Sequence, residues 1–174
     1  GLLRSAVEDP SPVLFLEHKK AYRIVKGLLP RGNQHRVPIG KARISRPGKD
    51  ATIITYGLMA QYAILAADRV QEDLGASIEV LDLRTISPLD KAAIVDSTMR
   101  TAKVLIVHED NISFGVGAEV AAIIAEEAFW GLDAPVMRLA MPDLPAIGFS
   151  KNLEAEASIT TDKIVKSVSE LLAF

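Results

Sequence analysis

Apolar and polar residues along this chain switch repeatedly between the period of a strand and the period of a helix. From residue 51 onward, predicted strands and helices alternate, and short glycine or proline segments separate them. We expect strands at 51–56, 78–83, 104–108 and 135–139, and helices at about 59–74, 87–100, from 116 and from 161. Because no hairpin signal joins the strands, the pattern predicts an α/β fold with a mostly parallel sheet and helices on both faces.

The first 50 residues are organised differently. An apolar helix over 2–7 ends at Asp9-Pro10, and a compact apolar strand is expected at 13–16. Residues 18–48 are rich in basic residues, glycine and proline, which is a linker composition. We therefore expect a domain boundary here, with 1–37 as a tail and linker and 38–174 as a complete domain. Since Gly1 begins in the middle of a helix pattern, we also expect the chain to be a fragment.

The overall composition excludes several classes of function. With 49% hydrophobic residues and a net charge of −2, the chain is typical of a soluble globular protein and gives no sign of binding nucleic acid. The absence of cysteine excludes disulfides, thiolate metal sites and cysteine nucleophiles. No apolar run reaches the roughly 18 residues that span a membrane. We expect a cytoplasmic protein without a membrane segment.

The strongest local pattern is a strand that ends at His108, followed by the loop Phe114-Gly115-Val116-Gly117 and a helix. Helix N-termini at this edge of a parallel sheet often bind phosphates. The loop, however, lacks both the G-x-G-x-x-G pattern and the lysine of a P-loop, and Glu119 would repel an anion. We favour the alternative that the glycines let the helix pack close to the sheet.

His108 is the main candidate for chemistry, because it lies beside Glu109 and Asp110. Neighbours on a strand point to opposite faces, so adjacency does not form a catalytic pair. We favour a structural or interface role for His108. His18 and His35 are expected on the surface, and no spacing matches a zinc, calcium or serine-hydrolase site. The residues therefore predict no catalytic set, while Phe129-Trp130 is expected in the core or at a partner surface.

Several strings, in order, resemble one family. They are residues 1–17, Tyr22-Arg23, Pro38-Ile39-Gly40-Lys41-Ala42, the block at 79–90 that contains D-L-R-T-I-S-P-L-D, and Gly117-Ala118-Glu119-Val120. The chain resembles the C-terminal half of the E1 β subunit of 2-oxo acid dehydrogenase complexes, in the transketolase family. The resemblance covers nearly the whole chain, and the block ending at Asp90 is its most specific part.

The resemblance implies a three-layer α/β/α sandwich like the transketolase C-terminal domain, with one antiparallel edge strand. It assigns 1–37 to the tail of a pyrimidine-binding domain and its linker. It also implies an α2β2 enzyme that uses thiamine diphosphate and Mg²⁺ to decarboxylate a 2-oxo acid and acylate the lipoyl group of E2. The family's catalytic glutamate, its histidine and its diphosphate motif lie outside the matching residues, so no catalytic or cofactor-binding residue is expected here.

One ion site is implied in part. Some members of the family bind potassium with oxygens from the stretch that matches Ala6, Asp9 and Ser11, and such hard oxygen ligands suit the ion. The second loop of that site has no match in this chain, so we expect the site to be empty. The simpler interpretation is a helix end with a solvated Asp9.

The remaining implied role is assembly with the E1 α subunit, a second E1 β subunit and the basic docking domain of E2. Acidic positions near the end of the chain are candidates for the E2 contact, together with the terminal residue: Asp143, Glu154, Glu156 and Phe174. Because an exposed subunit interface leaves an apolar patch, we also expect the fragment to dimerise.

Alternatives remain open within and outside the family. The acetoin dehydrogenase β subunit is nearly the same protein, and transketolase or 1-deoxyxylulose-5-phosphate synthase share the fold. A stand-alone α/β module with a ligand at the Gly115–Gly117 loop is the alternative from another class. The chain also departs from the family, since Phe114-Gly115 stands where two glycines are common. The segment from Asp143 likewise departs from the pattern Asp-x-Pro-x-Pro.

Overall fold

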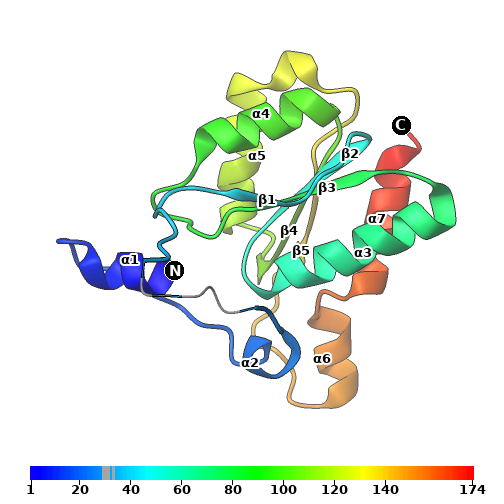
Figure 1. The fold of residues 1–174 in the computed structure, drawn as a ribbon. Helices are drawn as coiled ribbons and strands as arrows, with labels where there is room; N and C mark the ends of the chain where they lie inside the picture. Colours follow the sequence, from blue (N-terminus) through cyan, green and yellow to red (C-terminus); the bar gives the residue numbers. More distant parts are fainter. Residues whose placement is uncertain (29–31, 33) are drawn as a thin grey trace.

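A five-stranded sheet forms the centre of the structure, a computed structural model that describes residues 1–28, 32 and 34–174 (Figure 1). The strand order is β1-β3-β2-β4-β5. β1 runs antiparallel to β3, whereas the other neighbouring pairs are parallel. The strands are β1 Arg43–Arg46, β2 Ala51–Thr55, β3 Ile78–Asp82, β4 Val104–Asn111 and β5 Met137–Met141. The expected mixed, mostly parallel sheet is thereby confirmed.

Helices cover both faces of this sheet (Figure 1). α3 and α7 pack on one face, and α4 and α5 pack on the other, so the expected three layers are present. The helices are α1 Leu2–Glu8, α2 Ala21–Ile24, α3 Leu58–Leu74, α4 Lys91–Thr101, α5 Val116–Glu127, α6 Lys151–Ala157 and α7 Thr161–Leu172, with a 3-10 turn, η1, at Phe129–Gly131.

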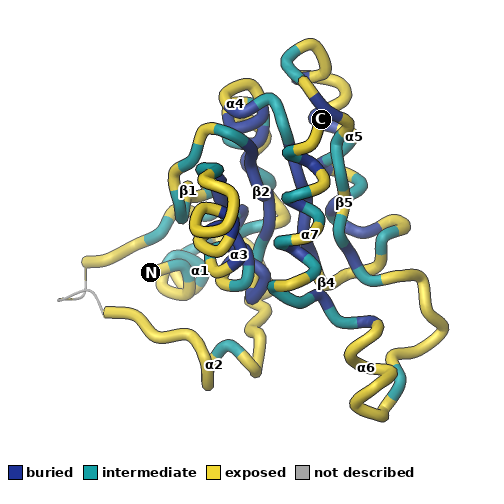
Figure 2. The backbone as a smooth tube through the Cα atoms, turned by 90° about the vertical axis from the view of Figure 1, so that its right-hand side faces the viewer, coloured by how far each residue is buried: buried dark blue, intermediate teal, exposed yellow. Residues whose placement is uncertain are grey.

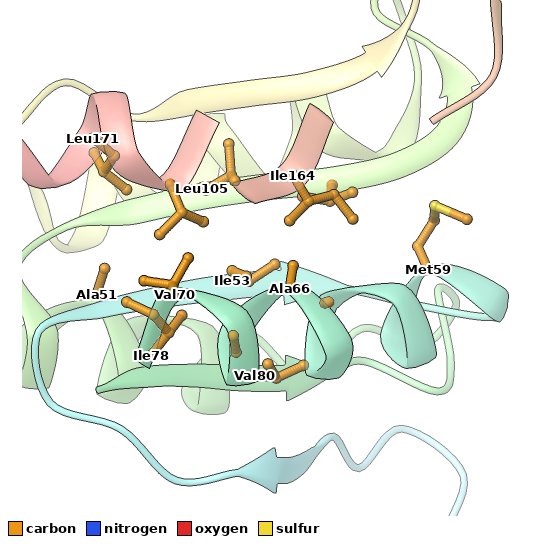
Figure 3. Packing of buried hydrophobic residues seen from close by; sticks show 14 of the residues in the cluster. Ala51, Ile53, Met59, Ala66, Val70, Ile78, Val80, Leu105, Ile164 and Leu171 are labelled. Atoms are coloured by element: carbon orange, nitrogen blue, oxygen red, sulfur yellow. The ribbon is translucent and has the colours of Figure 1, made fainter. Parts of the chain in front are cut away.

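The core consists of two apolar layers, one on each face of the sheet. Ile53 faces α3 and α7, whereas its neighbour Ile54 faces α4 and α5, as the alternation of a strand requires. Figure 3 shows the first layer, where Val70 of α3 and Ile164 of α7 lie over the strands. All four side chains are fully buried, and each such burial stabilises the fold by about 1.5–3 kcal/mol.

Two predicted features of the backbone are wrong. Residues 13–16 form no strand; Leu14 is 92% exposed, and these residues pair with no described strand. Helix α4 begins at Lys91 rather than near Ser87, because the Asp90 carboxylate, not the Ser87 hydroxyl, accepts the capping hydrogen bond from the Ala93 N–H at 3.3 Å. An apolar run alone is therefore not enough to predict a strand, because a strand also needs a partner strand. A Ser-Pro pair alone is likewise not enough to predict the first residue of a helix.

Two elements have no counterpart in the pattern analysis. β1 reads Arg-Ile-Ser-Arg and carries little apolar signal, although the family resemblance implies such an antiparallel edge strand. α6 falls in the segment after residue 150, and its only buried residue is Ala157. Both elements lie at the margin of the domain, where few apolar side chains are needed.

Two of the strings that carry the family resemblance, residues 38–42 and the block ending at Asp90, contact each other. The Thr85 hydroxyl accepts a hydrogen bond from the Gly40 N–H at 3.0 Å, and the Asp90 carboxylate accepts one from the Ala42 N–H at 3.0 Å. Gly40 has φ of +76°, and a Cβ there would lie 2.9 Å from Cγ of Pro88. Residues 38–42 therefore bind to the block at 82–90, which joins the incoming chain to the start of α4.

A charged network joins β3 to α4, and its Glu79 end is buried. Glu79 is 1% exposed, and one of its carboxylate oxygens accepts hydrogen bonds from Arg100 Nε at 3.1 Å and Nη2 at 2.8 Å. The other oxygen accepts one from the Thr52 hydroxyl at 3.1 Å, and that hydroxyl lies 2.8 Å from the Thr101 hydroxyl. Both carboxylate oxygens of Glu79 are thus engaged, as a buried charge requires.

The N-terminal segment lies mostly on the surface (Figure 2). His18 Nε2 contacts Glu109 at 3.1 Å, and Lys20 Nζ lies 5.6 Å from the ring centroid of Tyr62. A domain boundary near residue 37 remains a prediction, and residues 29–31 and 33 of the expected linker lie outside the described residues. In the described part of the chain, no helix is both long and apolar enough to cross a membrane.

Candidate functional site at the carboxyl edge of the sheet

His108 lies on β4 near the edge where the parallel strands end, and it faces α5. The residue is 1% exposed, and its ring stacks on Tyr56 with centroids 6.3 Å apart and planes 12° apart. Burial lowers the pKa of the His108 imidazole; the charge of Asp110 opposes this shift, and Arg138 adds to it. The structure therefore holds His108 as a neutral imidazole.

Tyr56, which the sequence analysis did not single out, is the second titratable group at this edge. Burial is the main cause that raises the pKa of the Tyr56 phenol to about 12, and the negative charges of Asp110 and Glu109 contribute. At neutral pH, the uncharged Tyr56 phenol thus stacks on the uncharged His108 imidazole, next to the carboxylates of Glu109 and Asp110. Neither group is poised near neutral pH for proton transfer.

The glycine loop provides room for His108. A Cβ at Gly117 would lie 2.2 Å from Nε2 of His108. A Cβ at Gly115 would lie 2.3 Å from the Asn111 carbonyl oxygen and 2.8 Å from Cε1 of the His108 ring. Gly115 has φ of −71°, so close approach rather than a special dihedral requires the glycine. This packing confirms that the glycines let the helix approach the sheet.

The ring nitrogens of His108 have no hydrogen-bond partner among the described residues. Glu109 is exposed and contacts His18, while Asp110 accepts from its neighbour, the Asn111 N–H, at 2.8 Å. No carboxylate therefore orients the imidazole, which a catalytic histidine would need. The structural role of His108 is the one that the geometry favours.

At the start of α5, the His108 ring packs against Gly117, and Glu119 in the first turn adds a negative charge, so this helix end does not suit an anion such as a diphosphate. No group of three His, Cys, Asp or Glu side chains in the described ranges is placed to hold a metal ion. The residues at this edge therefore do not fit thiamine diphosphate with its Mg²⁺.

The expected potassium ligands lie at the end of α1. Ala6 is in the last turn of the helix, and Asp9 follows it as the C-cap. The Ser11 N–H donates a hydrogen bond of 2.9 Å to Asp9 Oδ1 in an exposed turn. The structure thus brings Asp9 and Ser11 together, in a turn that also matches the simpler interpretation of a solvated helix end.

The expected interface residues fall on two opposite ends of the domain. Glu154 and Glu156 are exposed on α6, and Asp143 accepts hydrogen bonds from the Ser113 hydroxyl at 2.6 Å and from the Ser113 N–H at 3.3 Å. Phe174, which is 67% exposed, follows α7 at the other end of the domain (Figure 1). A helix of 12 residues is about 18 Å long. The four residues therefore do not form one patch.

A shallow cavity of about 540 Å³ opens beside η1, at the far end of α5. Trp130 is 95% exposed and Phe129 is 57% exposed, with their rings edge to face and centroids 5.1 Å apart. Ala121, Asp133 and Pro135 also line the cavity. Figures 1 and 2 place the C-terminus at this same end. Of the two expectations for Phe129-Trp130, the structure thus supports a partner surface.

These features define the class of protein, a transketolase-like α/β sandwich. At the carboxyl ends of its parallel strands, the packed side chain of His108 occupies the space beside α5. The family model described as "Transketolase, C-terminal domain" matches residues 40–164. The chain belongs to this family.

Known relatives extend beyond this domain. The chain is 47% identical over 174 residues to the 2-oxoisovalerate dehydrogenase subunit beta of Bacillus subtilis (strain 168), covering 100% of this chain and 53% of that protein. It is 44% identical over 143 residues to the pyruvate dehydrogenase E1 component subunit beta of the same organism, covering 82% of this chain and 43% of that protein. The chain thus spans about half the length of the curated relatives it matches.

A solved structure supports the fold. The chain resembles a split-gene transketolase described as an inactive beta4 tetramer, with a TM-score of 0.69 and 26% identity, over 80% of this chain and 44% of that one. The expected resemblance to E1 β subunits and to the transketolase C-terminal fold is confirmed.

The His108 environment predicts a pH dependence of stability. Because the folded-state pKa of His108 lies below its unfolded value of about 6.5, its contribution is fully present above that pH. That contribution is lost as the pH falls from about 6.5 towards the folded-state pKa. Urea unfolding at pH 5 and pH 8 should therefore show a smaller pH effect in His108→Gln than in the wild type. His35→Gln, a change at an exposed histidine, is the control; equal pH effects in all three proteins would refute the assignment.

Proposed function

We propose that this chain is the assembly domain of the β subunit of a thiamine-diphosphate-dependent 2-oxo acid dehydrogenase, the E1 component. The observation that carries the proposal is the 47% identity to a 2-oxoisovalerate dehydrogenase β subunit along all 174 residues. In the whole enzyme, E1 decarboxylates a 2-oxo acid and transfers the acyl group to the lipoyl group of E2. Thiamine diphosphate and Mg²⁺ supply the decarboxylation chemistry and are held by the α subunit and by the rest of the β subunit.

The geometry supports a role in assembly rather than in catalysis. His108 is enclosed by Tyr56, Gly115 and Gly117, so a substrate has no access to its ring. Exposed aromatic rings instead lie at both ends of the domain, at Phe114 and Trp130. The proposed partners are the E1 α subunit, a second β subunit and E2, in the cytoplasm.

The substrate assigned to the complex is a branched-chain 2-oxo acid, in line with the 2-oxoisovalerate relative. Pyruvate remains the second candidate, because the pyruvate dehydrogenase β subunit is nearly as similar. The test is decarboxylation by the full-length β subunit with its α partner, using an artificial electron acceptor. Faster turnover of 2-oxoisovalerate than of pyruvate supports the assignment. Faster turnover of pyruvate would assign the chain to a pyruvate dehydrogenase complex instead. Turnover of acetoin alone would identify an acetoin dehydrogenase.

E2 docking is assigned to the end of the domain that carries Phe174. There, the cavity beside Trp130 offers apolar surface, and Asp133 offers a negative charge to a basic docking domain. We expect Asp133→Asn with Trp130→Ala to weaken E2 binding by about 2 kcal/mol or more, since buried aromatic and charged contacts dominate interfaces. If Ala at Asp143, Glu154 and Glu156 weakens E2 binding instead, the docking site lies on the α6 side.

A potassium ion at Ala6, Asp9 and Ser11 is a subordinate proposal. The turn leaves one Asp9 oxygen available, and the second loop of the site would come from the rest of the β subunit. A thermal midpoint of the full-length protein that is equal in KCl and in NaCl would rule the ion out.

A further inference from the structure

Phe114, in the loop between β4 and α5, combines two unfavourable features. Its φ is +61°, in the left-handed region where a non-glycine residue costs about 1–2 kcal/mol. Its side chain is 102% exposed, so the described chain recovers nothing by burying the ring. Strain that persists at an exposed loop points to a use outside the domain itself.

The loop around Phe114 is held in place on both sides. The Ile112 N–H donates to the Met141 carbonyl at 2.8 Å, and Arg138 Nη1 donates to the Ile112 carbonyl at 2.8 Å. The Ser113 hydroxyl and N–H both donate to Asp143. With α5 beginning at Val116, the ring stands on a fixed support. A backbone ordered in advance reduces the entropy lost when the ring binds, which makes Phe114 a suitable anchor.

The charges beside this loop indicate the kind of partner. Asp110 precedes the loop, Asp143 is bonded to it, and Glu119 lies in the first turn of the helix that follows. Arg138 is the nearby cation, and its guanidinium binds the Ile112 carbonyl. Pairing of this patch with the same patch of a second copy would bring like charges together, whereas a basic surface would be attracted.

We propose that Phe114 is an aromatic anchor that inserts into an apolar, basic-rimmed pocket on a different polypeptide, the α subunit of the enzyme. The identity of that polypeptide rests on the function proposed above. An exposed aromatic ring on an ordered loop is an arrangement typical of an interface anchor.

The surroundings of this edge favour a subunit over a small docking domain. His18 of the N-terminal segment contacts Glu109, so that segment adjoins the same edge. The segment carries further exposed apolar side chains, with Leu14 at 92%, Leu16 at 86% and Tyr22 at 66%. Phe114 thus lies at an edge that has further exposed apolar surface beside it.

The test uses full-length β subunits that carry Phe114→Ala or Phe114→Gly, with Leu65→Ala on α3 as a control for the loss of an exposed apolar side chain. The dissociation constant for the purified α subunit is measured by titration. Both Phe114 variants should weaken α binding about 10- to 30-fold, and Leu65→Ala should not. Phe114→Gly should also make the isolated β subunit more heat-stable than Phe114→Ala, because glycine relieves the left-handed backbone.

Three results would overturn the proposal. The first is unchanged α affinity in both Phe114 variants. The second is a loss of stability of the isolated β subunit in Phe114→Ala, which would place the ring in a pocket of the β subunit itself. The third is weaker binding to E2 alone. Failure of the proposed function is distinguishable, because it would appear as absent 2-oxo acid turnover in the wild-type α–β pair.

Discussion

Replacing Arg100 by Met should lower the free energy of unfolding by about 3 kcal/mol. Arg100 binds the carboxylate of Glu79, which is 1% exposed, so its removal leaves a buried charge without its ionic partner. The remaining hydrogen bond from the Thr52 hydroxyl does not neutralise that charge. Because the Arg100 side chain is itself 43% exposed, the expected loss lies at the low end of the range for broken buried pairs. Urea unfolding at neutral pH measures it.

Two further variants separate the charge from the packing. Glu79→Gln in the Arg100→Met background should restore part of the stability, since it removes the unpaired charge at nearly constant volume. Arg69→Met removes an ion pair with Asp162 whose side chains are 47% and 82% exposed, and it should change stability by less than about 1 kcal/mol. Equal losses for Arg69→Met and Arg100→Met would contradict this account of the network.

Gly117→Ala should destabilise the domain by about 1–3 kcal/mol, although alanine is the better helix former. The added Cβ would lie 2.2 Å from Nε2 and 2.6 Å from Cδ2 of His108. That ring is buried against Tyr56 and cannot move aside without disturbing the sheet edge. Thermal or urea unfolding of the single variant gives the size of the effect.

Combining Gly117→Ala with His108→Ala tests whether the clash with the His108 ring causes the loss of stability. Without the imidazole, the tightest remaining neighbour given for the added Cβ is Cγ2 of Ile106 at 3.3 Å, a contact that a small shift relieves, so Gly117→Ala should become neutral or stabilising by up to about 1 kcal/mol. The coupling between the two substitutions is then about 2 kcal/mol or more, as is typical of residues in contact. Additive effects would show that Gly117 is needed for a reason other than room for His108.

The central elements follow from the sequence because their signals are local and strong. The β-branched run before His108, the glycine after α3 and the amphipathic face of α7 each correspond to an element of the structure. β1 could not be found from its own residues, because Arg43–Arg46 offers little apolar pattern and is defined by its pairing with β3. Residues 13–16 show the reverse case: they have the apolar pattern of a strand, but they pair with no strand among the described residues.

The site was predictable only in part, for a similar reason. The glycine loop and its closeness to the strand end could be inferred, since a loop without phosphate-binding features favours packing. That the ring of His108 fills this space, and that Tyr56 stacks on it, depends on the parallel pairing of β2 with β4. Glu79 likewise belongs to the alternating pattern of the strand predicted at 78–83, and only the arrangement of α4 shows that Arg100 reaches it. Contacts between distant segments are not encoded in local periodicity.

The most direct test of an assembly domain without its own catalytic set is a comparison of decarboxylation rates. 2-Oxoisovalerate and pyruvate are supplied, with thiamine diphosphate and Mg²⁺, to the 174-residue chain alone, to the α subunit alone, and to the α subunit with the full-length β subunit. Circular dichroism establishes that each protein is folded. We expect turnover only in the complete pair. Turnover by the 174-residue chain alone would contradict the account and would direct attention back to His108.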